Sequence, residues 1–318
     1  MVDPWSLRIL LEVAERGSFS AAAESLVLTQ PAVSRQMSGL ERQLGVMLFR
    51  RVPRGVTLTT AGTTAVDLAR GVLGRLDVLE ATMKSFAGLD NSHLRMSGFA
   101  SVNTHFVPDA IRRFHDAHPA VTVSLLQVDS LEGLAAVHSG QVDVALLTEW
   151  QLYADPMAAR TDPAPVALRS ADLAGVDLIP LVEEELLLAV ARDHPLAAHR
   201  TVRLRDLRDE IWIEGAHPDC LGPIAQLTAA MGGSPRIGFT CDDWNGKQAL
   251  VAGGSGIMLM PTLAAAAIRP DIELRPTMPR LAPRPLYIAV AEPPFRSPAA
   301  QAMAQLLQTM VPTSEPPG

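Results

Sequence analysis

The sequence predicts a multidomain protein of mixed α+β and α/β class. An N-terminal winged helix-turn-helix is expected, joined by a long linker helix to a C-terminal α/β domain with two lobes. Three observations predict this organisation: short amphipathic helical patterns with a Pro-Arg-Gly turn near the N-terminus, a heptad pattern after them, and alternating strand and helix patterns from Leu94 onwards. At 318 residues, the chain is long enough for two or three domains.

Composition argues against several classes of protein. Hydrophobic residues make up 48% of the chain, yet no apolar run reaches the length of a membrane span. The acidic start of the chain does not resemble a secretory signal, so we expect a cytoplasmic protein. Cys220 and Cys241 lack the CxxC spacing of a zinc site and are too few for a disulfide framework. We therefore expect neither a metal nor a cofactor.

Charge is distributed unevenly along the chain. The net charge is −7, but residues 1–60 contain seven arginines against five acidic residues, a local net charge of +2. The remaining 258 residues therefore carry −9. The basic excess is small and lies at one end, so the acidic total does not exclude binding of nucleic acid by the N-terminal region.

The first two helices are indicated by their first residues and their apolar spacing. Asp3 and Pro4 supply an N-cap and a first-turn proline, and helical spacing continues until Gly17. Ser18 begins a shorter helix that runs to Leu26, and its alanines permit close approach of neighbouring helices. With a third helix close behind, this pattern is typical of a helix-turn-helix unit.

The third helix has one apolar and one polar face. It opens at Pro31 after a capping Thr29 and ends near Gly45. The apolar face is expected to pack in the core and consists of Val33, Met37, Leu40 and Leu44. The outer face carries short or hydrogen-bonding side chains suited to a major groove, namely Pro31, Ser34, Arg35, Ser38 and Arg42.

A two-stranded wing is predicted next. In "VMLFRRVPRGVTLTTAG" the turn Pro53-Arg54-Gly55 lies between a short apolar segment and the alternating Val56-Thr57-Leu58. Thr59 or Thr60 is expected to cap the helix that follows, from Ala61 to about Leu89.

This linker helix carries a heptad seam of Ala65, Ala69, Val72, Leu76, Leu79, Met83 and Phe86. A three-helix domain cannot cover so long a seam, so we expect a partner helix from a second copy of the chain. Packing of the seam on the chain's own C-terminal domain is the alternative.

From Leu94, short apolar runs suited to buried strands alternate with helical patterns. The runs are "LRMSGFA", "VTVSLLQV", "VDVALLT", "LLLAVA", "IWIEG", "RIGFT", "GIMLMP" and "LYIAVAE". The helical patterns are Val107 to His118, Leu131 to Ser139, Leu221 to Met231 and Trp244 to Ala252. This alternation predicts α/β sheets with helices on both faces, and the Pro-broken, Ala-rich stretch 155–175 suggests two lobes.

The segment from Leu10 to Gly62, beginning "LLEVAERGSFSAAAESLVLTQPAVSRQMSGLERQLG", closely resembles the winged-helix signature of the LysR-type transcriptional regulators. "LVEEELLLAVARDHPLA" and "ALVAGGSGIMLMP" resemble that family's effector-binding half. The resemblance implies a homodimer joined through the linker helix, or a homotetramer. It also implies a two-lobed effector domain similar to periplasmic binding proteins. We expect a DNA-binding domain at 1–60, a linker helix at 61–90 and an effector-binding domain at 91–318, with lobe I about 91–182 and 270–318 and lobe II about 183–269.

Double-stranded DNA is the expected partner of the N-terminal domain. Arg35 suits a bidentate contact with guanine and Gln30 a contact with adenine, whereas Thr29 and Ser34 suit phosphate oxygens. The wing arginines are expected at the DNA backbone or minor groove. The predicted DNA-binding residues are Thr29, Gln30, Pro31, Ser34, Arg35, Ser38, Arg51 and Arg54. Arg42 and Arg50 are as well explained as solvated surface residues.

A small-molecule effector is expected at the carboxyl ends of the strands. The loop "ASVNTHF" follows the first strand, and by the resemblance it holds inducers. The predicted effector-binding residues are Ser101, Asn103, Thr104, Ser130, Thr148, Glu214 and Trp244. Hydroxyl groups and helix N-termini favour a small carboxylate. An amine or a neutral polar compound is equally favoured by the acidic residues Asp129, Glu149, Glu214, Asp242 and Asp243. No arginine is evident in the first-lobe loops.

The predicted function is therefore a sequence-specific regulator that binds an inverted-repeat operator and responds to a small molecule, with RNA polymerase as a further candidate partner. An enzyme is disfavoured because "GGSG" precedes a strand and neither GxSxG nor HExxH occurs. A transport binding protein would lack the helix-turn-helix. A peroxide sensor of the same family would need Cys220 and Cys241 placed to form a disulfide.

Overall fold

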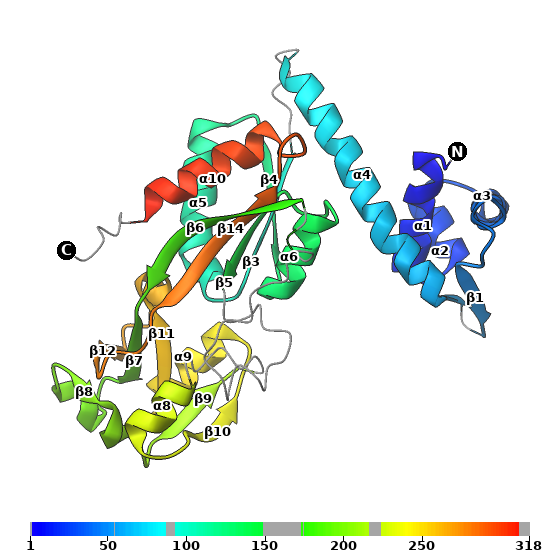
Figure 1. The fold of residues 1–318 in the computed structure, drawn as a ribbon. Coiled ribbons are helices and arrows are strands. Elements are labelled where there is room, and N and C mark those ends of the chain that lie inside the picture. The colour runs from blue at the N-terminus through cyan, green and yellow to red at the C-terminus, as the bar shows by residue number, and fades with distance from the viewer. Residues whose placement is uncertain are drawn as a thin grey trace.

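The computed structural model describes residues 2–53, 55–86, 93–148, 173, 175–215 and 224–311 of the chain. Figure 1 shows a small helical head at the N-terminus, one long helix leaving it, and two α/β lobes formed by the rest of the chain. No helix within these residues is long and apolar enough to cross a membrane.

The head consists of three helices and a hairpin: α1 (Pro4–Arg16), α2 (Phe19–Ser25), α3 (Gln30–Leu44), β1 (Phe49–Val52) and β2 (Gly55–Leu58). The predicted N-cap of the first helix is confirmed, and the second helix also has a side-chain cap. The Asp3 carboxylate accepts from the Trp5 backbone N–H at 3.3 Å, and the Ser18 hydroxyl accepts from that of Ala21 at 3.5 Å. The apolar faces meet in a core that includes Ile9, Leu10, Val13, Ala22, Val33, Met37, Leu40 and Leu48.

The third helix departs from expectation at its last turn. Val33, Met37 and Leu40 are buried as predicted, but Leu44 is 43% exposed, so its assignment to the core was wrong. Leu44 is the last residue of α3, and the chain then turns away at Gly45, which has a φ of 72°. Leu48 fills the core in its place.

The linker helix α4 (Thr60–Phe86) begins after Thr59, whose hydroxyl accepts from the Gly62 backbone N–H at 3.0 Å. Its first turns pack on the head through the buried residues Val66 and Ala69. An apolar stripe along α4 is exposed, and it consists of the predicted heptad members Val72, Leu79 and Met83 together with Leu68, which was not predicted. We call these four residues the seam of α4. Ala69, a predicted member of the heptad, contributes to the head core instead.

Lobe I contains a five-stranded sheet of order β4-β3-β5-β14-β6. Its strands are β3 (His93–Gly98), β4 (Thr122–Gln127), β5 (Val144–Thr148), β6 (Val176–Glu184) and β14 (Arg284–Ala291). β3 pairs in parallel with β4 and β5, whereas β14 runs antiparallel to β5 and β6. The helices are α5 (Phe106–Ala117), α6 (Ser130–His138) and α10 (Pro298–Met310), with a 3-10 turn η1 (Val102–Thr104).

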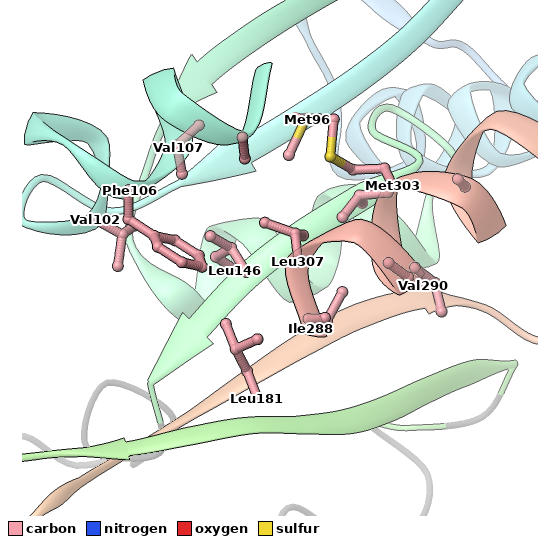
Figure 2. Packing of buried hydrophobic residues seen from close by; sticks show 14 of the residues in the cluster. Met96, Val102, Phe106, Val107, Leu146, Leu181, Ile288, Val290, Met303 and Leu307 are labelled. Atoms are coloured by element: carbon pink, nitrogen blue, oxygen red, sulfur yellow. The ribbon is translucent and has the colours of Figure 1, made fainter. Parts of the chain in front are cut away.

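Side chains alternate along each strand, so each face of this sheet carries its own apolar residues. Helices cover both faces. Leu146 on β5 and Ile288 on β14 belong to the core beneath α5 and α10, whose packing Figure 2 shows. Their neighbours Ala145 and Ala289 belong to a second cluster with Leu134 of α6. The predicted arrangement of helices on both faces is therefore confirmed for lobe I.

Lobe II is built on β7 (Leu186–Ala191), which lies between β11 (Met258–Pro261) and β12 (Ile272–Arg275). Two strand pairs join it, β9 (Ile211–Glu214) with β10 (Arg236–Thr240) and β8 (Val202–Arg203) with β13 (Thr277–Met278). The helices are α8 (Ile224–Met231) and α9 (Trp244–Ala252), with 3-10 turns η3 (Pro195–Ala198), η4 (Leu204–Leu207) and η6 (Thr262–Ala267).

All eight apolar runs predicted as strands form strands, and the four predicted helical patterns form helices, the pattern from Leu221 being described only from Ile224 onwards. β6, β8, β12, β13 and α10 were not predicted. The return to lobe I also comes later than expected, because β12 pairs with β7 and β13 with β8. The chain rejoins the five-stranded sheet only at Arg284, not near residue 270.

Candidate nucleic-acid interface and ligand cavity

The N-terminal end of α3 presents most of the predicted DNA-binding residues to solvent. Thr29, Gln30, Pro31, Arg35 and Ser38 are exposed, and Ser34 is half-buried. Thr29 is in the N-cap position, but its side chain makes no capping hydrogen bond. The threonine hydroxyl therefore remains available to a phosphate oxygen. The backbone N–H groups of Ala32 and Val33 already donate to the Thr29 carbonyl, at 2.9 and 3.2 Å, and Pro31 has no N–H.

The arginines of α3 differ in how they are held. Arg35 is exposed, and within the described part of the chain no hydrogen bond or ion pair engages its guanidinium. The Arg42 side chain instead folds back on its own helix, where Nε donates to the Ser38 carbonyl at 3.2 Å. Arg35 therefore keeps its five N–H donors for a ligand, which is what bidentate recognition of a base requires.

The wing is held to α3 by a carboxylate that sequence reasoning did not single out. Glu41 Oε1 accepts the backbone N–H groups of Leu48 and Phe49 at 2.8 and 3.2 Å. The Phe49 ring packs edge-on against Phe19 with centroids 5.6 Å apart. Glu41 therefore joins α3 to the start of the wing, and Phe49 joins the wing to α2.

Two of the wing arginines are among the described residues, and both lie on the exposed hairpin. Arg50 and Arg51 are exposed on β1, opposite Thr57 and Val56 of β2. Arg54 falls outside the described residues. The Val56 N–H donates to the Gly17 carbonyl at 2.9 Å, which anchors the second wing strand to the end of α1.

A cavity of about 360 Å³ lies between the lobes. From lobe I it is lined by the segments that follow β3 and β4, including Phe99, Ser101 and Asp129. From lobe II it is lined by β7, β9, β11 and the start of α9, including Trp244 and Lys247. Because β3 and β4 are parallel, their carboxyl ends meet at one edge of the sheet, where α/β proteins bind ligands.

Only two of the seven predicted effector-binding residues, Ser101 and Trp244, line this cavity. The others lie outside its lining. Asn103 donates from Nδ2 to the Gly98 carbonyl at 2.7 Å, and the Thr104 hydroxyl donates to the Ser101 carbonyl at 2.6 Å. These two side chains stabilise the loop after β3.

Ser130 and Thr148 are fully buried, and the Ser130 hydroxyl accepts the Thr148 N–H at 2.9 Å. Glu214 is also buried, and Glu149 falls outside the described residues.

A buried arginine reaches the cavity from a strand of lobe I, and not from the first-lobe loops in which none was evident. Arg284, at the start of β14, lines the cavity and is 5% exposed. Its Nε donates to Glu184 Oε1 at 2.7 Å, and its Nη2 donates to the Ser101 hydroxyl at 2.9 Å. The guanidinium also lies 5.0 Å from the centre of the Phe99 ring. No local pattern in the sequence indicates that Arg284 lies at the cavity, because it is 183 positions from Ser101.

Lys247 is the second buried cation of the cavity. It is 4% exposed, and its Nζ lies 5.7 Å from the centre of the Trp244 ring. The Trp244 indole N–H is buried without a hydrogen-bond partner among the described residues. Three carboxylates line the same space: Asp129, Glu132 and Asp242. The cavity therefore offers both donors and acceptors beside an apolar wall of Leu186, Ile213, Met258 and Leu259.

Metal binding receives no support from the described residues, where no three His, Cys, Asp or Glu side chains cluster suitably. The exposed basic surface and the internal cavity lie in different domains of one chain. This arrangement is typical of a DNA-binding regulator that responds to a small molecule. Residues 5–63 match the bacterial regulatory helix-turn-helix protein model of the lysR family, and residues 87–312 match the LysR substrate binding domain. The chain belongs to the LysR family of transcriptional regulators.

Individual relatives agree with this assignment. The chain is 31% identical over 261 residues to the DNA-binding transcriptional dual regulator OxyR of Escherichia coli K12, covering 81% of this chain and 78% of OxyR. It is 28% identical over 269 residues to the regulator ClcR of Pseudomonas putida, with 83% and 84% covered.

Solved structures share the fold. CbnR, a LysR family transcriptional regulator, superposes with a TM-score of 0.67 at 24% identity, covering 97% of this chain and 99% of CbnR. A full-length OxyR variant from Pseudomonas aeruginosa gives 0.71 at 21% identity, with 100% and 99% covered.

Proposed function

We propose that the protein binds an inverted-repeat operator, with α3 in the major groove of each half-site and the wing against the flanking backbone. Arg35 carries this proposal, because it is an exposed arginine on the outer face of α3 whose donors are free among the described residues. A structure of full-length CbnR complexed with target DNA has the same fold, with a TM-score of 0.65. Regulation of transcription would then take place in the cytoplasm and involve RNA polymerase.

A second copy of the chain is proposed to cover the seam of α4. Leu68, Val72, Leu79 and Met83 are each 47–67% exposed and recur at helical spacing along one side of the helix. Pairing with the same helix of another chain would remove this apolar surface from water, giving a homodimer that can assemble further into a homotetramer. We place the DNA-binding domain at 1–60, the linker helix at 61–90 and the effector-binding domain at 91–318.

The effector is proposed to be a small molecule that binds in the 360 Å³ cavity and carries both a carboxylate and hydrogen-bond donors. Arg284 and Lys247 suit the carboxylate, whereas Asp129, Glu132 and Asp242 suit donor groups. A thermal-shift screen of hydroxy acids, amino acids and amines tests this proposal, since a ligand at 100 times its Kd stabilises the folded state by about 2.7 kcal/mol. The shift should be lost in Trp244→Ala. A shift given only by amines would refute the carboxylate.

The DNA contacts are tested by comparing Arg35→Ala with Arg42→Ala. An operator is first selected from random-sequence DNA with the wild-type protein, and binding to it and to unrelated DNA is then measured by fluorescence anisotropy. Arg35→Ala should reduce the preference for the operator by about tenfold or more. Arg42→Ala should leave the preference unchanged, because this side chain bonds its own helix. Unchanged binding of Arg35→Ala to both DNAs would contradict the assignment.

Peroxide sensing is the second candidate, because several relatives are named hydrogen peroxide-inducible genes activators, at 30–31% identity. In this chain Cys241 lies next to the cavity wall and its Sγ faces the Asp243 carbonyl at 3.5 Å, whereas Cys220 is outside the described residues. We propose that the cavity, not a thiol pair, receives the signal. Titrating operator binding against peroxide, with and without Cys220→Ser, tests this, and a peroxide response that depends on Cys220 would overturn it.

A further inference from the structure

Helix α6 connects the ligand cavity to the linker helix. Its first residues follow Asp129, which caps the helix by accepting the Glu132 N–H at 2.8 Å, and both carboxylates line the cavity. Its last residue is His138, and the turn that follows it touches α4. Nine helical residues span about 13 Å, so one short rigid element reaches from the cavity wall to the linker helix.

The contact at the far end of α6 depends on two glycines that face each other. A Cβ atom placed on Gly74 of α4 would lie 2.5 Å from the Gly140 carbonyl oxygen and 2.7 Å from its Cα. Gly140 itself has a φ of 68°, a conformation that glycine adopts without strain. One turn earlier on α4 the space is wider, because a Cβ on Gly71 would be 3.6 Å from the Ser139 carbonyl oxygen. The backbones are thus in direct contact at Gly74 and not at Gly71.

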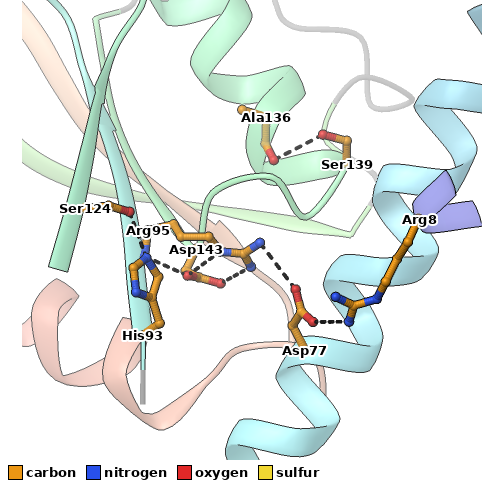
Figure 3. A network of polar contacts seen from close by, with 8 residues as sticks. All are labelled: Arg8, Asp77, His93, Arg95, Ser124, Ala136, Ser139 and Asp143. Carbon is orange, nitrogen blue, oxygen red and sulfur yellow. Dashed lines mark hydrogen bonds and ion pairs between the residues drawn. The ribbon is translucent and has the colours of Figure 1, made fainter. Parts of the chain in front are cut away.

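A network of ion pairs lies one turn along α4 from this contact, at Asp77 (Figure 3). Asp77 of α4 lies 3.6 Å from Arg8 of the head and 3.7 Å from Arg95 of lobe I. Arg95 Nη2 also donates to Asp143 Oδ1 at 2.8 Å, beside the start of β5. Burial lowers the pKa of Arg95, but the hydrogen bond and charge of Asp143 outweigh this and raise the pKa above its usual value. Asp77 is half-exposed, so its two ion pairs orient the head and lobe I more than they stabilise them.

The contact and the seam lie on opposite sides of α4. At about 100° per residue, Gly74 and Asp77 fall on the side of the helix away from Val72 and Leu79. A second copy of α4 on the seam therefore leaves the contact with lobe I intact. Arg75 lies between the two sides and holds its guanidinium 4.6 Å from the centre of the Phe295 ring.

We propose that α6 transmits the state of the ligand cavity to the linker helix through the contact between Gly140 and Gly74 of the same chain. A ligand that engages Asp129 or Glu132 acts on the start of α6. A shift of that helix then displaces the backbone that α4 rests against, and Arg8 and Asp77 connect α4 to the head. The signalling role rests on the proposed function, but the mechanical coupling does not, and it is measured without DNA or ligand.

Hydrogen exchange in Gly74→Ala and Gly71→Ala tests the coupling. Both substitutions favour helix equally, but only Gly74→Ala places a Cβ inside the Gly140 backbone. In Gly74→Ala, the backbone amides of residues 130–134 at the start of α6 should exchange about fivefold faster or more than in wild type. A factor of about five is the lower end of the coupling that is usual between two sites of one protein. Gly71→Ala should match wild type. Equal exchange at 130–134 in all three proteins would overturn the proposal, and the circular dichroism spectrum verifies that each variant folds.

A crosslink establishes whether the contact lies within one chain. In a background of Cys220→Ser and Cys241→Ser, Gly71→Cys is combined with Ser139→Cys, because a Cβ at 71 would lie 3.9 Å from the Ser139 Cα, within reach of a disulfide. Oxidation should produce an intrachain disulfide. The protein should then run at the mass of a monomer on a non-reducing gel, and a digest of it should contain a peptide crosslinked between positions 71 and 139. A disulfide between two chains, or no disulfide, would refute docking within one chain.

Discussion

Two arginines mark the difference between the head and the C-terminal domain. Arg35 is exposed on a helix surface, and its guanidinium is free among the described residues. Arg284 is 5% exposed and is held by Glu184 and Ser101. An arginine that contacts a DNA base must be solvated in the free protein and lose that water on binding. Such a side chain makes few contacts within the protein, so it contributes little to the free energy of folding. A cavity arginine is part of the core of its lobe and cannot be removed without leaving a buried carboxylate unpaired.

The largest expected effect follows from breaking the buried pair. Arg284→Ala leaves Glu184, whose side chain is 1% exposed, without its cation, and should lower the free energy of unfolding by about 3–5 kcal/mol. Urea denaturation monitored by tryptophan fluorescence measures this loss.

The exposed pair of Arg280 and Glu185, with side chains 75% and 54% exposed, is the matched control. Arg280→Ala should cost about 0.5 kcal/mol or less. If Arg284→Ala were equally mild, the pair would not stabilise the wall of the cavity.

A smaller loss is expected where the head positions its wing. Glu41→Ala removes the acceptor of two backbone N–H groups and should lower the free energy of unfolding of the head by about 2 kcal/mol. Glu41→Gln keeps a carbonyl oxygen at the same place and should retain most of the stability. Thermal melts of the full chain provide the measurement, and equal melting temperatures for the two variants would show that the wing is held by packing alone.

The turn between α2 and α3 should gain stability from a substitution. Val27 has a φ of 56° and is 91% exposed, so a β-branched residue occupies the left-handed region without any packing to compensate. Val27→Asn should stabilise the head by about 1 kcal/mol, because asparagine tolerates this conformation. Val27→Ala, which keeps a Cβ but loses the branching, should gain less. A loss of stability in Val27→Asn would mean that the valine contacts something in the assembled protein.

The smallest effect concerns an exposed pair in lobe II. A hydrogen bond and the charge of Arg269 hold the pKa of the Asp271 carboxyl below its usual range. A lowered pKa in the folded state contributes stability that is present above the unfolded pKa and is lost as the pH falls through the folded pKa. Asp271→Asn should therefore lower the melting temperature slightly at neutral pH and not at about pH 2. A difference that persisted in acid would contradict an ionic origin.

The outer face of α3 was predictable because it is local. Helical period alone separates Val33 and Met37 from Ser34 and Arg35, and the structure confirms that separation. The prediction that Leu44 is buried was wrong, because helical periodicity does not show at which residue a helix ends. The helix α10 was missed although Ser297 and Pro298 form a capped first turn, which is a signal present in the sequence.

The cavity was predictable only in its location. Strand ends indicated where a ligand binds, and Ser101 and Trp244 do line the space. Asn103 and Thr104 are also polar residues of this loop, but their side chains donate to backbone carbonyls of the loop itself. Only the hydrogen-bond geometry shows this difference. Sequence reasoning assigned the segment after residue 270 to lobe I, whereas β12 and β13 first complete lobe II.

The family, the helices of the head and the apolar runs that become strands are all readable from the sequence. The helices and strands depend on residues close together in the chain, and the family on a nearly continuous motif from Leu10 to Gly62. The contact of Arg284 with Ser101 and that of Gly74 with Gly140 are visible only in the folded chain. The first follows from strand order, which places β14 between β5 and β6, and the second from the absence of a side chain on either glycine. Contacts of this kind join residues far apart in the chain, and no local pattern encodes them.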